Sequence, residues 1–261
     1  MAEKTSREGR LQDRVAIITG GAYGIGRSFC LGMAGEGAKI VIADIDLEAA
    51  KATAAEIEAQ GAEAIALKTD VSRPEDTLEM ARKAADRFGK IDILVNNAAI
   101  FARVKVSMVP FYELDLNEWD RLMEVNLKGP FLCSRAVFPY MKAQGRGKII
   151  NISSSTFFIG SPRFVHYVAS KAGVIGLSRS LASAMGEYNI NVNCIAPGRT
   201  FSEEPTDQDA LQRCQYSASL RLLKRIEYPD DLVGAAVFLA AADSDFVTGQ
   251  TIVVDGGISM H

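Results

Sequence analysis

The sequence predicts an α/β fold with one doubly wound, seven-stranded parallel sheet and helices on both faces. Short runs rich in valine and isoleucine alternate with longer amphipathic stretches along most of the 261 residues, which is typical of repeated βα units. These runs are apolar at nearly every position, as in strands buried on both faces. Gly37, Gly61 and Gly89 each follow a helical stretch, where a left-handed cap favours a residue without a Cβ atom.

The chain is expected to form a single domain over residues 14–261, after a flexible tail at 1–13. The segment at about 199–227 has weak periodicity and follows the sixth strand, where an open α/β sheet binds its ligands. We expect a substrate lid there, with an irregular surface loop as the alternative. The strands are expected at residues 15–19, 39–43, 64–67, 93–96, 148–152, 190–195 and 251–255, and the helices at 25–35, 47–60, 74–88, 117–144, 165–187 and 229–241.

Composition excludes several classes of protein. The formal net charge of −3 gives no basic surface for nucleic acid. The longest apolar runs fall short of the roughly 20 residues that cross a bilayer, and the first residues lack the apolar stretch of a secretory signal. The cysteines are too far apart in sequence to suggest a metal site or a disulfide framework. We therefore expect a cytoplasmic protein that acts on a small molecule, without metal, membrane or nucleic acid. The four cysteines are Cys30, Cys133, Cys194 and Cys214.

A glycine-rich turn follows the first strand and leads into a helix. Its spacing is G-x-x-x-G-x-G over residues 20–26. Glycines at such a turn let the backbone approach a pyrophosphate, and the first N–H groups of the helix point at the phosphates. The turn therefore predicts a Rossmann-type dinucleotide site. The expected contacts are Gly20, Tyr23, Gly24, Ile25 and Gly26.

Asp44 ends the second strand, about 20 residues beyond the turn, where a carboxylate accepts hydrogen bonds from the adenosine ribose. A 2′-phosphate would meet this negative charge, so NAD is favoured over NADP. Tyr23 supports NAD, because no arginine or lysine stands in that part of the turn. The alternative role of Asp44 is a helix N-cap, for which Asp46 is better placed.

Tyr167 and Lys171 lie four residues apart in a helical stretch, so their side chains share one face. A nearby ammonium favours the ionised phenol, and we expect it to lower the tyrosine pKa toward the neutral range. Ser154 leaves the fifth strand on the ligand side of the sheet, where its hydroxyl is able to donate to a substrate oxygen. A solvated helix face is the alternative for the tyrosine and lysine.

Together these residues resemble the short-chain dehydrogenase/reductase family, over residues 11–261. The family motifs occur in order: the glycine turn, Asp70-Val71, Asn96-Asn97-Ala98, Asn126, Ser154, Tyr167 with Lys171, and Pro197-Gly198. The resemblance implies hydride transfer between a nicotinamide cofactor and an alcohol or carbonyl carbon. It implies Asn126, Ser154, Tyr167 and Lys171 as catalytic residues.

The resemblance also implies further cofactor contacts. Lys171 is expected to bind the nicotinamide ribose as well as to act on Tyr167, and Asn126 to hold a water beside the lysine. Two positions depart from the family pattern: Ala99 replaces a glycine, and Ser202 replaces a threonine that binds the carboxamide, with Thr200 as a competitor. The remaining implied cofactor contacts are Asp70, Val71, Asn97, Ala98, Tyr167, Pro197 and Gly198.

The stretch between Ser154 and Tyr167 is expected to form a wall of the substrate pocket through Phe157, Phe158 and Phe164, although these rings have the alternative of packing beneath the loop. Ser154 and Tyr167 would also contact the substrate. An apolar or aromatic secondary alcohol or ketone would fit there, unless Arg163 or Arg199 meets an anionic group. This stretch and residues 255–261 resemble bacterial 1-phenylethanol and pyridoxal 4-dehydrogenases.

The leading expectation is an NAD-dependent secondary alcohol dehydrogenase. The alternatives are a carbonyl reductase of the 3-oxoacyl type and a cofactor-binding scaffold without turnover. The complete set of catalytic residues argues against the scaffold. The long helices at 117–144 and 165–187 resemble those through which family members assemble, so a homotetramer is expected.

Overall fold

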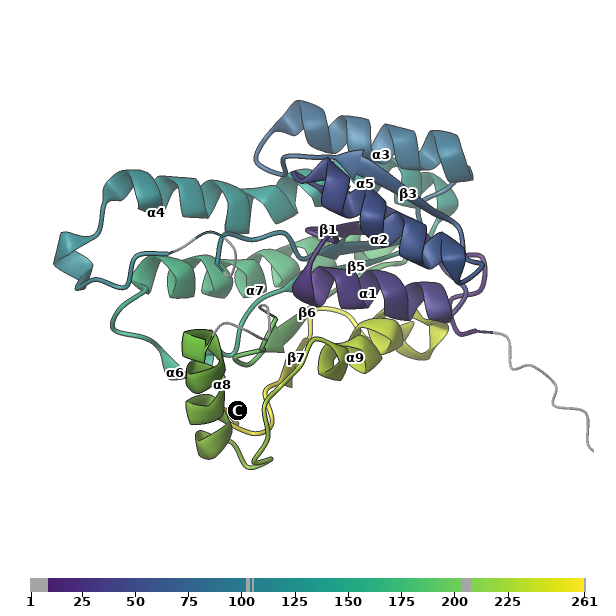
Figure 1. The fold of residues 1–261 in the computed structure, drawn as a ribbon. Coiled ribbons are helices and arrows are strands. Elements are labelled where there is room, and N and C mark those ends of the chain that lie inside the picture. The colour runs from purple at the N-terminus through teal and green to yellow at the C-terminus, as the bar shows by residue number, and fades with distance from the viewer. Residues whose placement is uncertain (1–8, 102–103, 105, 203–207, 261) are drawn as a thin grey trace, which may run out of the picture.

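The computed structural model describes residues 9–101, 104, 106–202 and 208–260, and Figure 1 shows their arrangement. The described residues form one seven-stranded sheet in the order β3-β2-β1-β4-β5-β6-β7, and every neighbouring pair is parallel. The chain reverses its direction of growth between β1 and β4, which is the switch point where such sheets bind ligands. The predicted fold class is confirmed. The strands are β1 (Val15–Thr19), β2 (Lys39–Asp44), β3 (Ala64–Lys68), β4 (Ile93–Asn96), β5 (Gly147–Ile152), β6 (Ile190–Pro197) and β7 (Thr251–Val254).

Successive side chains of each central strand enter two different cores. In β1, Val15 and Ile17 pack into the core on one face, whereas Ala16 and Ile18 pack into the core on the other. This alternation follows from the two-residue period of a strand. It explains why β1 is apolar throughout, since all five of its residues are buried.

Three helices cover each face of the sheet. One face packs against α1 (Gly24–Gly35), α2 (Leu47–Ala59) and α9 (Asp230–Ala240), and the other against α3 (Pro74–Phe88), α5 (Gly129–Gln144) and α7 (Val165–Met185). Single turns of 3₁₀ helix lie at Phe111–Glu113, Gly186–Tyr188 and Ala242–Ser244.

The helix expected at 117–144 is not continuous. It consists of α4 (Leu116–Met123), a π-helical turn (Glu124–Lys128) and α5. Pro130 gives the physical reason: it has no N–H to donate to the carbonyl four residues earlier, and its ring crowds that carbonyl. That carbonyl belongs to Asn126, so the wide turn falls at a predicted catalytic residue, as π-bulges commonly do.

The segment at 199–227 contains a helix that the sequence pattern did not predict, α8 (Gln208–Leu220). A short helix, α6 (Thr156–Ile159), follows β5. Figure 1 shows α4, α6 and α8 extending beyond the sheet on its left side. These helices supply walls around the ligand edge of the sheet.

The described part of the expected tail is packed, not free. Leu11 is fully buried in the core, and its N–H donates to the carbonyl of Glu36 at 2.9 Å. Arg10 forms an ion pair with the side chain of Glu36. Burial of one leucine and these contacts fix residues 9–13 to the end of α1, and residues 1–8 lie outside the described part.

Within the described part of the chain, no helix has both the length and the apolar content needed to cross a bilayer.

Candidate functional site

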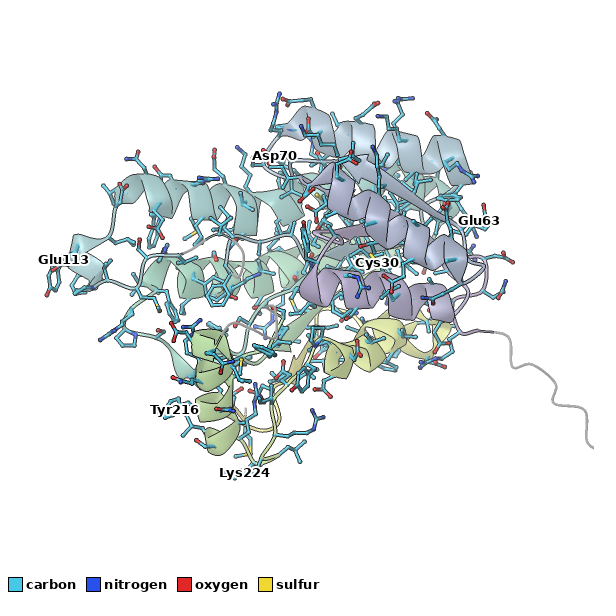
Figure 2. All side chains as sticks on the ribbon, in the orientation of Figure 1. Cys30, Glu63, Asp70, Glu113, Tyr216 and Lys224 are labelled. Atoms are coloured by element: carbon cyan, nitrogen blue, oxygen red, sulfur yellow. The ribbon has the colours of Figure 1, made fainter. Side chains whose placement is uncertain are left out.

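A cavity of about 2030 Å³ lies at the carboxyl edge of the sheet. Its lining includes residues that come directly after strands, such as Gly20 after β1 and Asn97 after β4. Figure 2 marks two distant points of this lining, Asp70 before α3 and Tyr216 on α8. The volume of the cavity is large enough for an extended ligand together with a second molecule.

The glycine turn after β1 can accept only glycine at several positions. Gly20 and Gly24 have φ of +64° and +50°, and a Cβ atom on Gly26 would lie 2.0 Å from the carbonyl oxygen of Gly20. The next helix, α1, begins without a capping side chain and without an acidic residue in its first turn. Its N–H groups and positive dipole end therefore suit a phosphate, so these residues fit the pyrophosphate of a dinucleotide.

Asp44 is buried at the end of β2 and lines the cavity. Its Oδ2 accepts from the N–H of Ala22 and its Oδ1 from the N–H of Asp46, both at 3.0 Å. These bonds fix the carboxylate and leave lone pairs on both oxygens for ribose hydroxyls. Asp46, not Asp44, caps α2, since it accepts from the N–H of Ala49. Tyr23 donates to the Asp46 carboxylate at 2.7 Å.

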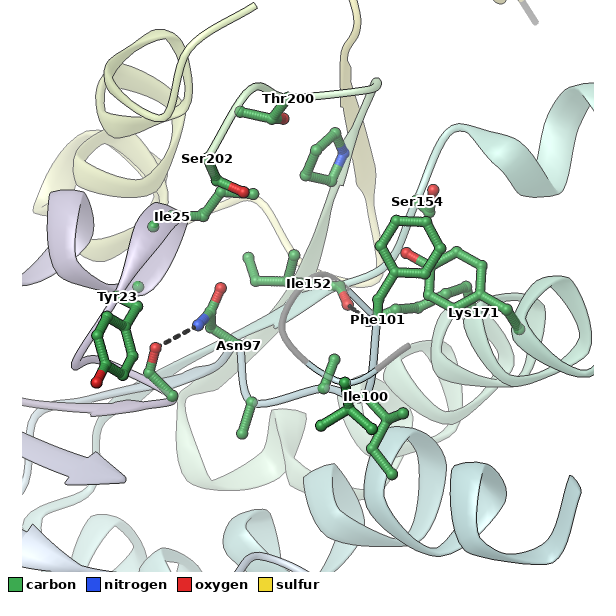
Figure 3. Close-up of a pocket in the computed structure, with 18 of the residues that line it drawn as sticks. Tyr23, Ile25, Asn97, Ile100, Phe101, Ile152, Ser154, Lys171, Thr200 and Ser202 are labelled. Carbon is green, nitrogen blue, oxygen red and sulfur yellow. Dashed lines mark hydrogen bonds between the residues drawn. The ribbon is translucent and has the colours of Figure 1, made fainter. Parts of the chain in front are cut away.

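Asn97 joins the turn to the end of β4. Its amide donates to the carbonyls of Thr19 and Gly20 at 3.0 and 2.9 Å, and the Thr19 hydroxyl accepts from the N–H groups of Asn97 and Ala98. Ala99 has no positive φ, so alanine causes no backbone strain where the family has glycine. In Figure 3, Asn97 lies between Tyr23 at one end and Phe101, Ser154 and Lys171 at the other.

The other predicted cofactor residues also line the cavity, including Asp70, Val71, Ala98, Pro197 and Gly198. The Asp70 carboxylate accepts from the N–H and hydroxyl of Ser72. Thr200 and Ser202, the two candidates for the carboxamide contact, also line the cavity. The Thr200 hydroxyl donates to the Glu227 carboxylate at 2.7 Å, and Ser202 lies beside Gly24 of the glycine turn.

Ser154, Tyr167 and Lys171 line the same part of the cavity. Tyr167 and Lys171 are buried one turn apart on α7, and the Nζ of Lys171 lies 5.8 Å from the centre of the tyrosine ring. That Nζ donates to the carbonyl of Ile152 at the end of β5, at 2.8 Å. The Ser154 hydroxyl is 2.8 Å from that of Thr156. The structure thus brings together residues that lie on two separate elements.

The protonation of this group differs from the expectation. Burial raises the pKa of Tyr167 to about 12, and the hydrogen bond from Ser154 and the charge of Arg199 offset only part of this rise. Burial also lowers the pKa of Lys171 to about 8. The expected net shift of the Tyr167 pKa toward the neutral range is therefore wrong for the chain by itself, because the net shift is upward. Loss of water around the phenolate outweighs the nearby positive charge.

Asn126 does not line the cavity, but it is hydrogen bonded to the loop after β4, which does. From the π-helical turn, its Oδ1 accepts from the N–H of Ile100 at 2.7 Å, and its Nδ2 donates to the Ile100 carbonyl at 3.3 Å. The same Nδ2 lies 3.5 Å from the hydroxyl of Ser170 on α7. Asn126 thus holds the loop after β4 against α7. The water that it was expected to hold stays a prediction.

Phe101, the next residue of that loop, was not singled out in the sequence. Its ring stacks on the Tyr167 ring, with 4.3 Å between centroids and 27° between planes, and it lines the cavity. Phe164 also lines the cavity and meets Tyr167 edge to face. Phe157 is 41% exposed, Phe158 packs against an apolar cluster on α7 and β6, and neither ring lines the cavity. No local sequence pattern predicts a role for Phe101, because its contact with Tyr167 depends on how the loop after β4 folds.

A residue of α4 also holds the loop after β4 in place. Glu118 accepts from the N–H of Ser107 at 2.7 Å and from its hydroxyl. The Nε2 of His166 lies 3.1 Å from the same carboxylate. His166 is fully buried and does not line the cavity, so it faces away from the catalytic residues.

The segment after β6 is fixed by a buried ion pair. Arg221 and Glu227, which are 1% and 5% exposed, lie 3.0 Å apart. Arg221 also donates to the carbonyl of Arg199 at 2.7 Å. A Cβ atom on Gly198 would lie 2.6 Å from the Glu227 carboxylate, which explains the glycine after Pro197. The two ends of the expected lid are thus joined beneath the cavity.

Among the described residues, no group of three or more histidine, cysteine, aspartate or glutamate side chains is arranged to hold a metal ion.

Comparisons with known proteins show the family of the chain. A family model described as short chain dehydrogenase matches residues 14–210. The chain is 41% identical over 259 residues to galactitol 2-dehydrogenase of Agrobacterium fabrum, covering 95% of this chain and 98% of that protein. It is 37% identical over 250 residues to a 3-oxoacyl-[acyl-carrier-protein] reductase of Thermotoga maritima, covering 95% and 99%.

A solved structure gives the same result for the fold. A short-chain type dehydrogenase/reductase from Mycobacterium marinum superimposes with a TM-score of 0.88 at 31% identity, covering 96% of this chain and 97% of that one. Such matches extend over nearly the whole chain. The chain therefore belongs to the short-chain dehydrogenase/reductase family of oxidoreductases, which use nicotinamide cofactors.

Proposed function

We propose that this protein is an NAD-dependent dehydrogenase of secondary alcohols, which transfers a hydride between the cofactor and a carbinol or carbonyl carbon. The observation that carries the proposal is the meeting of Ser154, Tyr167 and Lys171 in one cavity whose far end holds Asp44. The bound nicotinamide would supply or accept the hydride and, when oxidised, would add a positive charge to the cavity. All other steps belong to side chains of this chain.

Tyr167 is the proposed proton carrier. During oxidation its phenolate accepts the proton of the substrate hydroxyl, and during reduction the phenol returns a proton to the carbonyl oxygen. Ser154 donates a hydrogen bond to the same substrate oxygen. A positive charge close to the phenol lowers the pKa of Tyr167 from its raised value, so Lys171 and the oxidised cofactor act in the same direction. Lys171 also holds the ribose hydroxyls next to the nicotinamide.

The preference for NAD rests on the carboxylate of Asp44. Both of its oxygens are held by backbone N–H groups, so it has little freedom to turn away from a ligand. A 2′-phosphate at this place would bring two negative charges together in a partly buried site. Tyr23 and Asp46, which are hydrogen bonded to each other, add no positive charge. Ribose hydroxyls are the better partners.

An apolar or aromatic body is the proposed shape of the substrate. The rings of Phe101 and Phe164 both contact Tyr167, and Ile159 and Leu220 line the same cavity from α6 and α8. An alcohol that presents its carbinol carbon to Tyr167 would bury its remaining atoms against these side chains. We further propose that the segment at 199–227, with α8, acts as a lid over this end.

The alternative is a carbonyl reductase of the 3-oxoacyl type, and the similarity to the Thermotoga maritima reductase favours it. Asp44 argues for NAD and thus for the oxidation of an alcohol. A scaffold without turnover is disfavoured because the polar groups of Ser154, Tyr167 and Lys171 all meet in the cavity. The expected homotetramer and cytoplasmic location are also proposed, and light scattering at micromolar concentration would test the homotetramer.

A scan of secondary alcohols with NAD, followed by the absorbance of the reduced cofactor, tests the proposal. We expect turnover with at least one aromatic secondary alcohol, and none with the same alcohols in Tyr167→Phe. Turnover that requires NADPH and a 3-oxoacyl thioester, with no oxidation of any alcohol by NAD, would replace the proposal with the reductase. No turnover in either scan, together with tight binding of NAD, would favour the scaffold.

A further inference from the structure

Arg199 is an arginine of the cavity lining that has no ion-pair partner in the described part of the chain. It directly follows Gly198 at the end of β6, is partly buried, and lines the cavity. Across residues 9–101, 104, 106–202 and 208–260, its guanidinium has no ion pair and no hydrogen bond, whereas the nearby Arg221 and Arg225 each bind a carboxylate of the chain. Its positive charge also reaches the phenol of Tyr167, whose pKa it lowers. Arg199 therefore presents a free guanidinium close to the reacting group.

The backbone that carries Arg199 is fixed on both sides. The Gly198 N–H donates to the carbonyl of Val254 at 3.0 Å, and the Phe201 N–H donates to that of Glu227 at 2.8 Å. The carbonyl of Arg199 itself accepts from Arg221 at 2.7 Å. Arg221 also belongs to the buried ion pair with Glu227, whose two charges are both desolvated. This pair therefore holds the backbone from which Arg199 projects. The backbone from which the guanidinium projects is thus fixed before a ligand arrives.

The charges on this wall favour an anion. The lining residues contributed by 197–202 and by α8 include two arginines, Arg199 and Arg213, and no carboxylate. Of the carboxylates that line the cavity, Asp44 ends β2, Asp70 comes after β3, and Asp120 and Glu124 come from α4 and the turn that follows it, so none of these belongs to this wall. Arg213 is exposed, so Arg199 is the better placed to bind a ligand. Glu203 and Glu204 follow in sequence and lie outside the described residues.

We propose that the substrate carries a carboxylate, which Arg199 binds while the carbinol carbon lies at Tyr167 and the apolar body lies against Phe101 and Phe164. The planar guanidinium matches the two oxygens of a carboxylate with two parallel hydrogen bonds. This inference rests on the proposed function, since it concerns the same cavity. It specifies the substrate class as hydroxy acids, or the corresponding oxo acids, with an apolar body.

Matched alcohols test the proposal. The pairs are 1-phenylethanol with 4-(1-hydroxyethyl)benzoate, and 2-butanol with 3-hydroxybutyrate, in which the members differ chiefly in the carboxylate. We expect the acid to have at least a tenfold higher kcat/KM in at least one pair. Arg199→Gln should lower kcat/KM for that acid by about 10- to 100-fold, which is the range for a hydrogen bond to a charged group. Because Arg199 also lowers the pKa of Tyr167, the neutral member should lose some activity too, but less than the acid, so the ratio of kcat/KM for acid over neutral alcohol should fall by about tenfold or more.

Two variants serve as controls. Arg163→Gln removes an arginine that is exposed and does not line the cavity, and it should change neither member of a pair. Arg199→Lys keeps the charge but loses the planar fork, so it should recover part of the preference for the acid. Equal losses for acid and neutral alcohol in Arg199→Gln would overturn the proposal. So would a loss of NAD affinity, since the arginine would then bind the cofactor.

Binding without turnover separates this inference from the proposed function. Benzoate and benzyl alcohol are titrated calorimetrically into the NADH-saturated protein and into NADH-saturated Arg199→Gln. Stronger binding of benzoate that disappears in Arg199→Gln supports the anion site even if no alcohol is oxidised. Equal binding of the two probes to the parent protein, combined with no preference in the matched alcohols, rejects the anion site and leaves the dehydrogenase proposal standing.

Discussion

The two ends of the cavity are built in different ways. The end proposed for the adenosine and pyrophosphate consists mainly of backbone turns after β1, β2 and β4, joined by the hydrogen bonds of Asn97 and Asp44. The end proposed for the substrate consists of side chains from the loop after β4, from α6 and α7, and from the segment with α8. A phosphate needs N–H groups at fixed positions, which a turn provides, whereas a substrate is distinguished by side-chain shape and charge. The first end is thus suited to a phosphate-bearing ligand, and the second to a ligand recognised by its shape and charge.

The largest effect is expected at the residue where the two ends meet. Tyr167→Phe keeps the ring and its stacking on Phe101 but removes the group that carries the proton. We expect a loss of at least about 10²-fold in kcat. NAD affinity, measured by calorimetry, should stay within about threefold of the parent value.

Ser154→Ala is the matched comparison, because it removes a hydrogen-bond donor and leaves the proton carrier in place. It should lose less activity than Tyr167→Phe. Near-parent turnover by a folded, NAD-saturated Tyr167→Phe would show that another group carries the proton. Tyr167 would then not be the residue at which the two ends of the cavity meet.

The next effect concerns the cofactor end alone. NAD should bind at least about tenfold tighter than NADP, a difference of about 1.4 kcal/mol, because the 2′-phosphate would meet the Asp44 carboxylate. Asp44→Asn keeps the shape of the side chain and removes its charge, so it should reduce this preference. Glu48→Gln, on the exposed start of α2, is the control and should leave it unchanged. Calorimetric titration of both cofactors measures the ratio, and equal affinities in the parent would remove the role of Asp44.

The pH dependence of kcat/KM tests the role of Lys171, which is proposed to act on both the cofactor and Tyr167. Oxidation needs the ionised form of Tyr167, so its kcat/KM should rise with pH and level off above the pKa of that group, whereas reduction needs the neutral phenol and should fall. Burial sets this pKa at about 12 in the chain by itself, and the midpoint in the working complex should be lower because positive charges surround the phenol.

Lys171→Met removes one of those charges and should move the midpoint of the oxidation profile upward by about 1 pH unit or more. The pKa of Lys171 is lowered to about 8, so part of its charge is lost above that pH and the parent profile should broaden there. Stopped-flow rates over a pH series would measure both effects. An unchanged midpoint in Lys171→Met would mean that the lysine only positions the cofactor.

The smallest effect is expected at the substrate end. Phe101→Ala removes the ring that stacks on Tyr167 and should raise KM for an aromatic alcohol by about 2- to 10-fold, as expected for an aromatic pair. Phe157→Ala removes a ring that is outside the cavity lining and should leave KM unchanged. Initial-rate measurements with 1-phenylethanol compare the two. A larger rise in KM for Phe157→Ala than for Phe101→Ala would mean that Phe157, and not Phe101, contacts the substrate.

Local sequence patterns were sufficient for most of the fold. The strands of the sheet and the helices that face it carry strong periodic signals, and their predicted bounds agree closely with the structure. The break at Asn126 was missed although Pro130 marks it, because the apolar pattern continues across it. The helix at Gln208–Leu220 was missed because its buried residues are small, Ala210, Cys214 and Ala218, and give little contrast with the polar positions.

The sequence by itself determined the sheet, the glycine turn and the helical pairing of Tyr167 with Lys171, because each depends on residues that are close along the chain. The tertiary structure decided which side chains surround the reacting group. Phe101 reaches Tyr167 only because Asn126 holds the preceding residue. Among the described residues Arg199 has no ion pair, while Arg221 binds Glu227 and fixes the backbone of Arg199. Such contacts join residues far apart in sequence, and neither periodicity nor spacing records them.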